Sequence, residues 1–142
     1  MQESFLIELT KTHFGAVKEK NIEKIINYYS KTEDLLVFVE GPRWQTLGIE
    51  KVAKGWRDFV ETEIYVKHCS WIEFLQTKKT ENMGFVAGIV EMDLEIGGKE
   101  LKIKFRGTFI FEKGKDKIWR VIHEHFSQPA ADPYGIGDWL KV

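Results

Sequence analysis

Two consecutive hairpin signals between residues 85 and 127 constrain the fold more than any other part of this chain. Gly97-Gly98 separates two runs in which apolar and polar residues alternate, and a two-residue turn of this kind fixes the register of its strands. The predicted facing pairs are Leu94–Leu101, Met92–Ile103 and Val90–Phe105 on one side, and Asp93–Lys102 and Glu91–Lys104 on the other. Apolar pairs on one face and opposite charges on the other are typical of a correct register.

The second hairpin signal is Gly114-Lys115, which predicts Phe111 opposite Ile118 and Phe109 opposite Arg120. Side chains alternate between the faces of a strand. One predicted face carries Leu101, Ile103, Phe105, Phe109, Phe111, Ile118, Ile122, Glu124 and Phe126. The opposite face carries Arg106, Thr108, Ile110, Trp119, Val121, His123 and His125. Both faces are too apolar for open water, so we expect helices to cover the first and a second copy of the chain to cover the other.

Helical spacing dominates the first sixty residues. Apolar residues recur at i, i+3 and i+4 over residues 4–19 and 49–61, and Asn21 can cap another helix that continues to Tyr29. Short extended runs are predicted at residues 35–39 and 65–76. The order helix, helix, strand, helix and antiparallel meander predicts an α+β fold with a curved, mostly antiparallel sheet wrapped around N-terminal helices.

Composition excludes several classes of protein. The 142 residues suffice for one domain with a real core, here residues 1–142. A net charge of −1 gives no field that would gather nucleic acid, and no apolar run reaches the ~20 residues of a membrane helix. A single cysteine, Cys69, precludes a disulfide within the chain. With no signal-peptide pattern among its first residues, we expect a cytoplasmic protein.

The last residues, 127–142, differ from the rest in being rich in proline and glycine, which predicts an irregular tail. Trp139 and Leu140 are too apolar for a free end. We therefore expect the tail to dock on the body of the domain or on a partner subunit.

The residues of the second hairpin resemble a known pattern. Gly107-Thr108 on one predicted strand is followed by Trp119, His123-Glu124-His125 and Ser127 on the next. This order resembles SnoaL-like domains of the nuclear transport factor 2-like superfamily, and also the association domain of calcium/calmodulin-dependent protein kinase II. The resemblance covers the chain from Phe5 to Ser127. It implies an α+β cone, homodimers formed through the open sheet face, and a pocket between sheet and helices.

Members of this superfamily include polyketide cyclases, a steroid isomerase, epoxide hydrolases, dehydratases and non-catalytic assembly domains, so the fold alone does not fix the function. This chain departs from the steroid isomerase at two places. Phe14 stands where that enzyme has a tyrosine donor, and Gly41 in Val39-Glu40-Gly41-Pro42 stands where it has an aspartate base. Glu124 matches, by strand position, the aspartate that epoxide hydrolases keep on their last strand.

Glu124 is therefore the first candidate for chemistry. A carboxylate on an apolar face under the helices would have a raised pKa and could act as a general acid or base. The alternative is a structural acid that is hydrogen-bonded to Arg120, Tyr29 or a backbone group. Trp44, in the loop before the third helix, could close the mouth of a pocket or anchor that loop. The side chains expected to line the pocket are Phe14, Tyr29, Trp44, Trp56, Phe105, Phe109, Arg120, Ile122 and Phe126.

His123 and His125 lie on one face of one strand and could together bind a metal. No third ligand is evident in the sequence, so we interpret them as interface residues and expect no metal site. Arg106 could reach a partner's carboxylate or a ligand anion. The residues expected at the dimer interface are Arg106, Thr108, Trp119, Val121, His123 and His125.

Two functions from different classes remain open. In the first, a homodimer binds a small, largely apolar molecule in its cone and, if catalytic, moves a proton through Glu124 as an isomerase, cyclase or hydratase without a cofactor. In the second, the chain is a non-catalytic oligomerisation domain that scaffolds a partner. Neither function calls for nucleic acid or a membrane.

Overall fold

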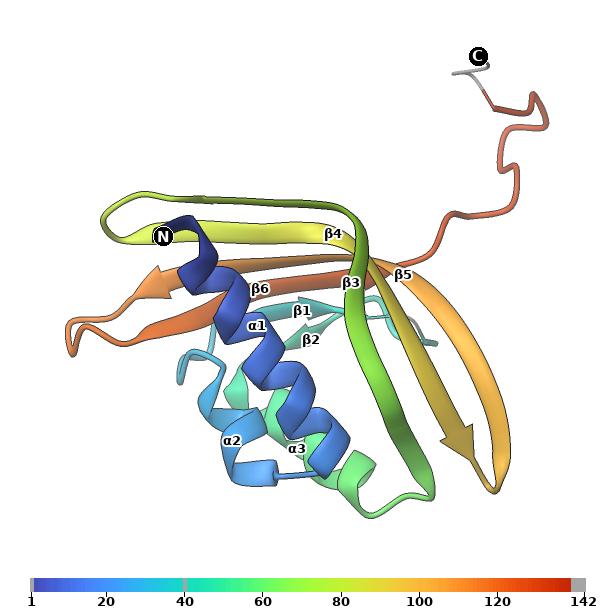
Figure 1. Ribbon diagram of the computed structural model, residues 1–142, viewed down its shortest axis with the longest axis horizontal. Coiled ribbons are helices and arrows are strands. Elements are labelled where there is room, and N and C mark those ends of the chain that lie inside the picture. Colours follow the sequence, from blue (N-terminus) through green and yellow to red (C-terminus); the bar gives the residue numbers. More distant parts are fainter. Residues whose placement is uncertain (1, 40, 139–142) are drawn as a thin grey trace.

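The computed structural model describes residues 2–39 and 41–138 and confirms the predicted α+β fold (Figure 1). Its elements, in chain order, are α1 (Gln2–Glu19), α2 (Ile22–Asn27), β1 (Leu36–Phe38), β2 (Thr46–Leu47), α3 (Ile49–Val60), β3 (Ile64–Lys79), β4 (Met83–Ile96), β5 (Lys99–Lys113) and β6 (Trp119–Ser127). The strands form one six-stranded sheet in the order β2-β1-β6-β5-β4-β3. The β1–β6 pair is parallel and the other pairs are antiparallel.

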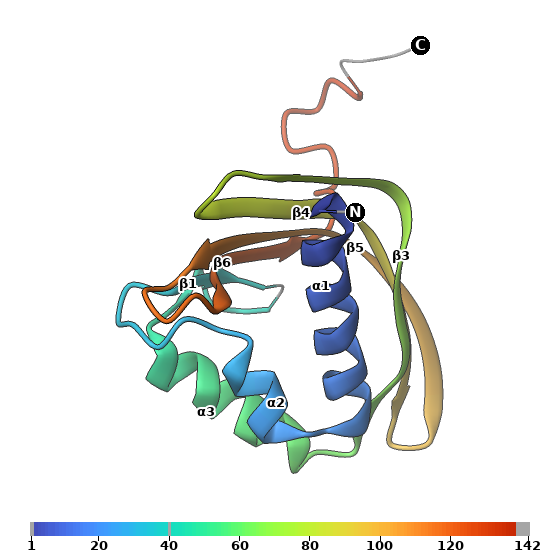
Figure 2. The same cartoon turned by 60° about the vertical axis from the view of Figure 1, so that its left-hand side comes forward.

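The helices lie on the concave side of the sheet, which bends around α1 (Figure 2). Leu6, Phe14 and Val17 of α1 are buried in the same core cluster as Val86 and Phe109 of the sheet. None of the described helices is long and apolar enough to cross a membrane.

The helix predicted to reach Tyr29 ends earlier, at Asn27. Asn21 caps its start as expected, accepting a hydrogen bond from Lys24 N at 3.2 Å. After α2 the chain pairs with β6 instead of continuing the helix: Val121 N–H donates to Tyr28 O at 2.9 Å, and Ser30 N–H donates to Val121 O at 2.8 Å. This short ladder places the side chain of Tyr29 beside β6.

Bulges and glycines shape the curved sheet. Register shifts interrupt the β3–β4 ladder at three places, between Val66 and Gln76, and bulges bend the strands that contain them. Gly88 and Gly107 face each other on β4 and β5. A Cβ atom on Gly107 would lie 3.0 Å from Phe126 Cζ, and one on Gly88 would lie 3.1 Å from Trp71 Cε3. The two glycines therefore make room for aromatic rings on the concave face.

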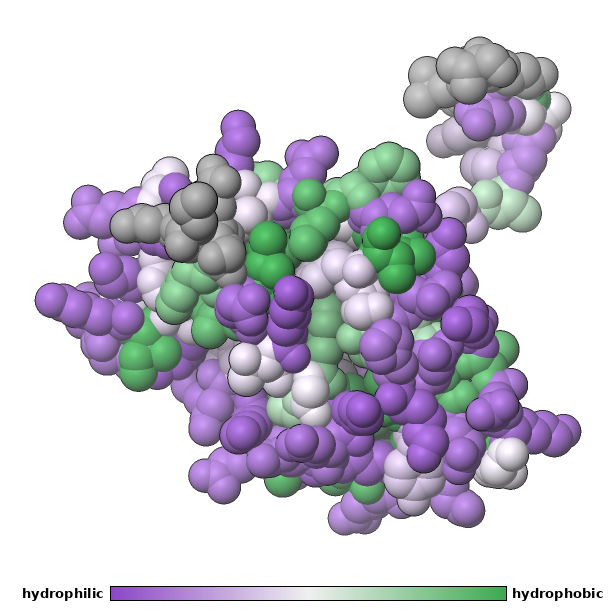
Figure 3. All heavy atoms as spheres, in the orientation of Figure 1, coloured by the Kyte–Doolittle hydropathy of each residue, from purple (hydrophilic) through white to green (hydrophobic). Residues whose placement is uncertain are grey.

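The outer surface of the β3 bend is less polar than its surroundings. In the view of Figure 3, hydrophobic spheres gather near this bend while the rest of that face is mostly hydrophilic. The exposed large hydrophobic residues of this part of β3 are Ile72, Phe74 and Leu75.

The predicted register of the first hairpin is confirmed at all five facing pairs. The register predicted for the second hairpin is wrong. Phe109 lies opposite Glu124, Phe111 lies opposite Val121, and the ladder shifts between Ile110 and Phe111. Ile122 is the residue that this bulge leaves unopposed on β6.

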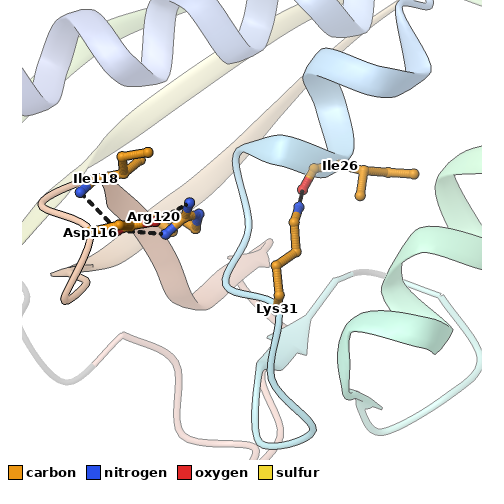
Figure 4. A network of polar contacts seen from close by, with 5 residues as sticks. All are labelled: Ile26, Lys31, Asp116, Ile118 and Arg120. Atoms are coloured by element: carbon orange, nitrogen blue, oxygen red, sulfur yellow. Dashed lines mark hydrogen bonds and ion pairs between the residues drawn. The ribbon is translucent and has the colours of Figure 1, made fainter.

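The turn of the second hairpin is longer than two residues because side chains close it (Figure 4). Asp116 Oδ1 accepts a hydrogen bond from Ile118 N at 3.0 Å, and Arg120 Nη2 donates to Asp116 Oδ2 at 2.8 Å. An aspartate that accepts from the backbone two residues on is a common turn former. Nearby, Lys31 Nζ donates to Ile26 O at 2.7 Å, and burial together with the Arg120 charge lowers the pKa of Lys31.

The new register corrects the faces of the residues before the bulge. Val121, expected on the open face, is fully buried on the helix side, and Trp119 packs edge-on against Phe5 of α1 with ring centroids 6.4 Å apart. Ile118, expected under the helices, is 51% exposed beside the turn.

The described part of the tail leaves the body of the domain (Figure 1). Its start is held by Gln128, whose Nε2 donates to Lys104 O at 3.0 Å. Residues 128–138 are exposed and contain neither helix nor strand. Trp139 and Leu140, on which the prediction of a docked tail rests, lie outside the described residues.

Candidate functional site

Two adjoining cavities lie between the helices and the concave face of the sheet. The outer one has a volume of about 270 Å³ and the inner one about 110 Å³. Both are lined by Val39, Trp56 and Glu124, so these residues mark their junction. The outer cavity is further lined by Val37, Arg43, Thr46, Lys51, Val52, Gly55 and Phe59. The inner one is further lined by His13, Phe14, Val17, Cys69, Met92, Phe109 and Phe126.

Glu124 lies at this junction, in the middle of the sheet. Its neighbours across the ladder are Phe109 of β5 and Val37 of β1, and it is only 4% exposed. Tyr29 Oη donates to Glu124 Oε1 at 2.6 Å, a length typical of a hydrogen bond to an ionised acceptor. Trp56 Nε1 of α3 donates in turn to Tyr29 Oη at 3.2 Å. Tyr29, which follows α2, and Trp56 of α3 therefore orient one buried carboxylate of β6.

Tyr29 is suited to remain a donor in this arrangement. Its side chain is fully buried, and burial together with the neighbouring Glu124 carboxylate raises the pKa of Tyr29 well above 10.0. The phenol consequently stays protonated at neutral pH. Of the partners expected for a structural Glu124, Tyr29 donates a hydrogen bond to the carboxylate. Arg120 pairs with Asp116 instead.

His13 is a polar residue of the site that sequence reasoning missed. It lies on α1, is 4% exposed and lines the inner cavity with Glu124. Its ring stacks on Tyr28 with centroids 3.9 Å apart and an interplanar angle of 7°. Burial lowers the pKa of His13 from 6.5 to about 3, so the imidazole is neutral at physiological pH. A signal existed in the sequence, because His13 lies four residues from both Leu9 and Val17 on the apolar stripe of α1.

The predicted pocket residues fall into three groups. Phe14, Trp56, Phe109 and Phe126 line the inner cavity, and Tyr29 binds the carboxylate at its edge. Phe105 is buried against Phe126, with ring centroids 6.1 Å apart. Three others lie elsewhere and correct the prediction: Trp44 is 95% exposed, Arg120 pairs with the turn, and Ile122 is half-buried at the bulge.

Four of the predicted interface residues lie next to one another on the sheet face away from the helices: Arg106, Thr108, His123 and His125. Thr108 is opposite His125, and Ile110 is opposite His123. His123 Nδ1 donates to Leu36 O at 2.8 Å, which fixes its ring. Arg106 Nη2 donates to Ser127 Oγ and to Gln128 O, both at 3.0 Å. Among residues 2–39 and 41–138 there is no cluster of three metal-ligating side chains, at the histidine pair or elsewhere.

The sequence matches the family of SnoaL-like domains over residues 8–131, and the chain belongs to this family. No curated protein matches the sequence. The fold is similar to that of a nuclear transport factor 2-like superfamily protein from Salmonella enterica serovar Typhimurium, with a TM-score of 0.78, 13% identity and 96% of each chain covered.

Two further solved structures show the same fold under different names. A protein from Xanthomonas campestris named as a calcium/calmodulin-dependent protein kinase II association domain has a TM-score of 0.73 and 19% identity, with 89% of this chain and 87% of that chain covered. A ketosteroid isomerase-like protein from Erwinia carotovora has a TM-score of 0.73 and 14% identity, with 92% and 98% covered. At such identities the similarity shows the fold alone.

Proposed function

We propose that this protein binds a small, largely apolar molecule in the two adjoining cavities and that Glu124 exchanges a proton with it. The observation that carries the proposal is the position of Glu124: a buried carboxylate, oriented by Tyr29 and Trp56, at the junction of two cavities with mainly apolar walls. Largely apolar pockets with a few convergent polar groups are the usual form of small-molecule sites.

The arrangement suits general acid–base chemistry. Isomerisation, cyclisation and hydration each need a proton to be moved to or from the bound molecule, and one positioned carboxylate can do this. Tyr29 and Trp56 hold one carboxylate oxygen in place, so little reorganisation is needed before a proton moves. The reaction requires no cofactor in this scheme.

The wall of the outer cavity favours a ligand with a negatively charged group. Arg43 and Lys51 line this cavity and are exposed, whereas Glu124 at the junction is buried. A molecule with its apolar body against Trp56 and Phe59 could therefore place an anionic group toward the two cations.

Native mass spectrometry of the purified protein, with identification of any released small molecule, tests ligand binding. A matched pair of glycines locates the site, because Gly55 of α3 lines the outer cavity and Gly15 of α1 does not. A Cβ atom on either would have no neighbour within 4 Å. Gly55→Leu should abolish the bound mass and Gly15→Leu should keep it. Equal occupancy in both variants would show that the ligand lies elsewhere.

A second function, non-catalytic assembly, is favoured by a different observation. The sheet face away from the helices carries Arg106, Thr108, His125 and Phe38, and the similar Xanthomonas protein is named as an association domain. A homodimer that forms through this face is common to both functions. If assembly is the whole function, Thr108→Glu should break the oligomer seen by native mass spectrometry, and Glu124→Gln should leave every cellular phenotype of the protein intact.

A further inference from the structure

The inner cavity contains two polar groups that approach it from opposite layers of the fold. Glu124 comes from the sheet and His13 from α1. The other residues that line it are Phe14, Val17, Val39, Trp56, Cys69, Met92, Phe109 and Phe126. A molecule that enters this cavity meets hydrogen-bonding side chains of His13 and Glu124 within otherwise apolar or aromatic walls.

The side chain of His13 has a buried polar atom without a hydrogen-bond partner. Its Nδ1 atom is buried and has no partner among the described residues, and the same holds for Tyr28 Oη beside it. Buried polar atoms without a partner are rare and each calls for an explanation. A core histidine kept only for packing would be expected to find a protein acceptor or donor.

The ring cannot find a partner by turning away. It is stacked on Tyr28, and the rings of Tyr29, Trp56 and Phe109 meet it edge-on at centroid distances of 5.6, 5.8 and 6.1 Å. These four contacts fix the imidazole plane. The ring is therefore held where it lines the inner cavity, and a molecule in that cavity is a partner that can reach it.

We propose that His13 is the second hydrogen-bonding group of the pocket, and that the ligand carries an oxygen function, a hydroxyl or a carbonyl, at the end that lies between His13 and Glu124. This inference rests on the proposed binding function and narrows the class of ligand. A neutral imidazole has one donor and one acceptor nitrogen, so it can serve either oxygen function. A carboxylate at the same end is disfavoured, because it would face Glu124 in a cavity whose lining residues include no arginine or lysine.

Three probes of similar shape test the proposal by equilibrium dialysis at neutral pH. 2-Naphthol has a hydroxyl that donates and accepts, 2-methoxynaphthalene has an oxygen that only accepts, and 2-methylnaphthalene has neither. The wild-type protein should bind 2-naphthol at least about fivefold more tightly than 2-methylnaphthalene, as expected for one satisfied buried hydrogen bond. Tight binding of 2-methoxynaphthalene as well would assign Nδ1 as a donor, because a carboxylate of Glu124 only accepts hydrogen bonds.

His13→Phe keeps an aromatic ring in place and removes both nitrogens. It should reduce the preference for 2-naphthol to what the Glu124 carboxylate alone provides, while 2-methylnaphthalene binds as before. A measurement on the wild-type protein needs no variant: long-range ¹H–¹⁵N NMR should show the His13 Nδ1 resonance move with 2-naphthol and stay with 2-methylnaphthalene.

The outcomes separate the two proposals. If 2-naphthol and 2-methylnaphthalene bind equally and the His13 resonance does not respond, the role of His13 is overturned while ligand binding stands. If no probe binds at all, the pocket does not take apolar molecules and both proposals fall.

Discussion

Acid should destabilise this protein through His13. Burial lowers the pKa of His13 to about 3 in the folded protein, whereas the exposed ring of the unfolded chain titrates near its ordinary value of about 6.5. The folded state therefore binds this proton more weakly than the unfolded state. Above pH 6.5 the titration of His13 does not change the free energy of unfolding, and as the pH falls from 6.5 toward 3 that free energy decreases.

The size of the loss follows from the width of this window. Each pH unit within it lowers the free energy of unfolding by about 1.4 kcal/mol. Between pH 7 and pH 4.5 the contribution of this one group is about 2.5 kcal/mol. That is a large part of the ~5–15 kcal/mol by which a domain of ordinary stability is folded.

Urea unfolding of the wild-type protein and of His13→Phe at several pH values between 7 and 4.5 measures the effect. We expect the two curves of free energy against pH to diverge by about 2.5 kcal/mol at the acid end. The titratable rings in contact with His13 are Tyr28 and Tyr29, which stay protonated in this range. Glu124 and Cys69 line the same cavity, and burial raises the pKa of Cys69 to about 12. Repeating both curves in a Glu124→Gln background removes the contribution of that carboxylate.

Parallel curves would refute the reasoning. They would show that His13 takes up a proton in the folded protein near its ordinary pKa, as a ring in contact with water does. The inner cavity would then be wet, and Nδ1 would already have a partner without a ligand.

Three other changes have defined expected results. Tyr29→Phe removes the donor to the buried carboxylate and should lower the free energy of unfolding, measured in urea, by about 2 kcal/mol. Tyr65→Phe, at a half-exposed ring, should leave that free energy unchanged. Equal effects of the two substitutions would mean that the short hydrogen bond does not stabilise the fold. Gly107→Ala brings a Cβ atom to 3.0 Å from an aromatic ring and should destabilise by about 1–3 kcal/mol, and a neutral result would show that the ring moves freely. The double variant Arg43→Gln, Lys51→Gln should lower the affinity for 8-anilinonaphthalene-1-sulfonate about threefold or more at low salt, because two cations are lost from the outer cavity. The affinity for its uncharged counterpart, N-phenyl-1-naphthylamine, should not change. An equal loss of affinity for both compounds would contradict the preference for an anionic group.

The first hairpin could be predicted in full because its turn is a local signal. Gly97 and Gly98 both adopt positive φ, of 56° and 85°, which two adjacent glycines permit without strain. With the turn fixed, alternation along β4 and β5 determines every facing pair. The second hairpin lacked such a signal, since its turn is closed by the side chain of Asp116 and contains Lys117 at a φ of 68°.

The size of the register error on each side of the bulge explains which side chains of the second hairpin were still assigned to the correct sheet face. Phe109 lies opposite Glu124 instead of Arg120, a shift of four residues, and an even shift leaves each side chain on its predicted face. Phe111 lies opposite Val121 instead of Ile118, a shift of three residues, and an odd shift reverses the faces. The face of Glu124 was therefore predicted correctly with a wrong partner, while Val121 and Trp119 were assigned to the wrong side.

That Glu124 and His13 line one cavity could not be read from the chain, although each residue lies on a recognisable apolar face. Their meeting depends on how α1 sits in the bend of the sheet, and that bend comes from bulges in β3 with no clear sequence signal. Tyr29 is a similar case. Helical spacing favoured a longer α2, but the backbone bonds from residues 28 and 30 to Val121 end that helix and turn the phenol toward Glu124.

The unopposed Ile122 connects these observations. Without a bulge, residues 121 and 124 of a regular strand would point to opposite faces, because side chains alternate. In this protein both are buried on the helix side, Val121 in the core and Glu124 at the cavities. The single extra residue thus allows one strand to close the core at its start and to present a carboxylate to the pocket three residues later. The same bulge sets the backbone of Val121 against residues 28 and 30, which brings Tyr29 within 2.6 Å of that carboxylate. The bulge at Ile122, which made the sequence-based register of the second hairpin wrong, is therefore the feature that assembles the site.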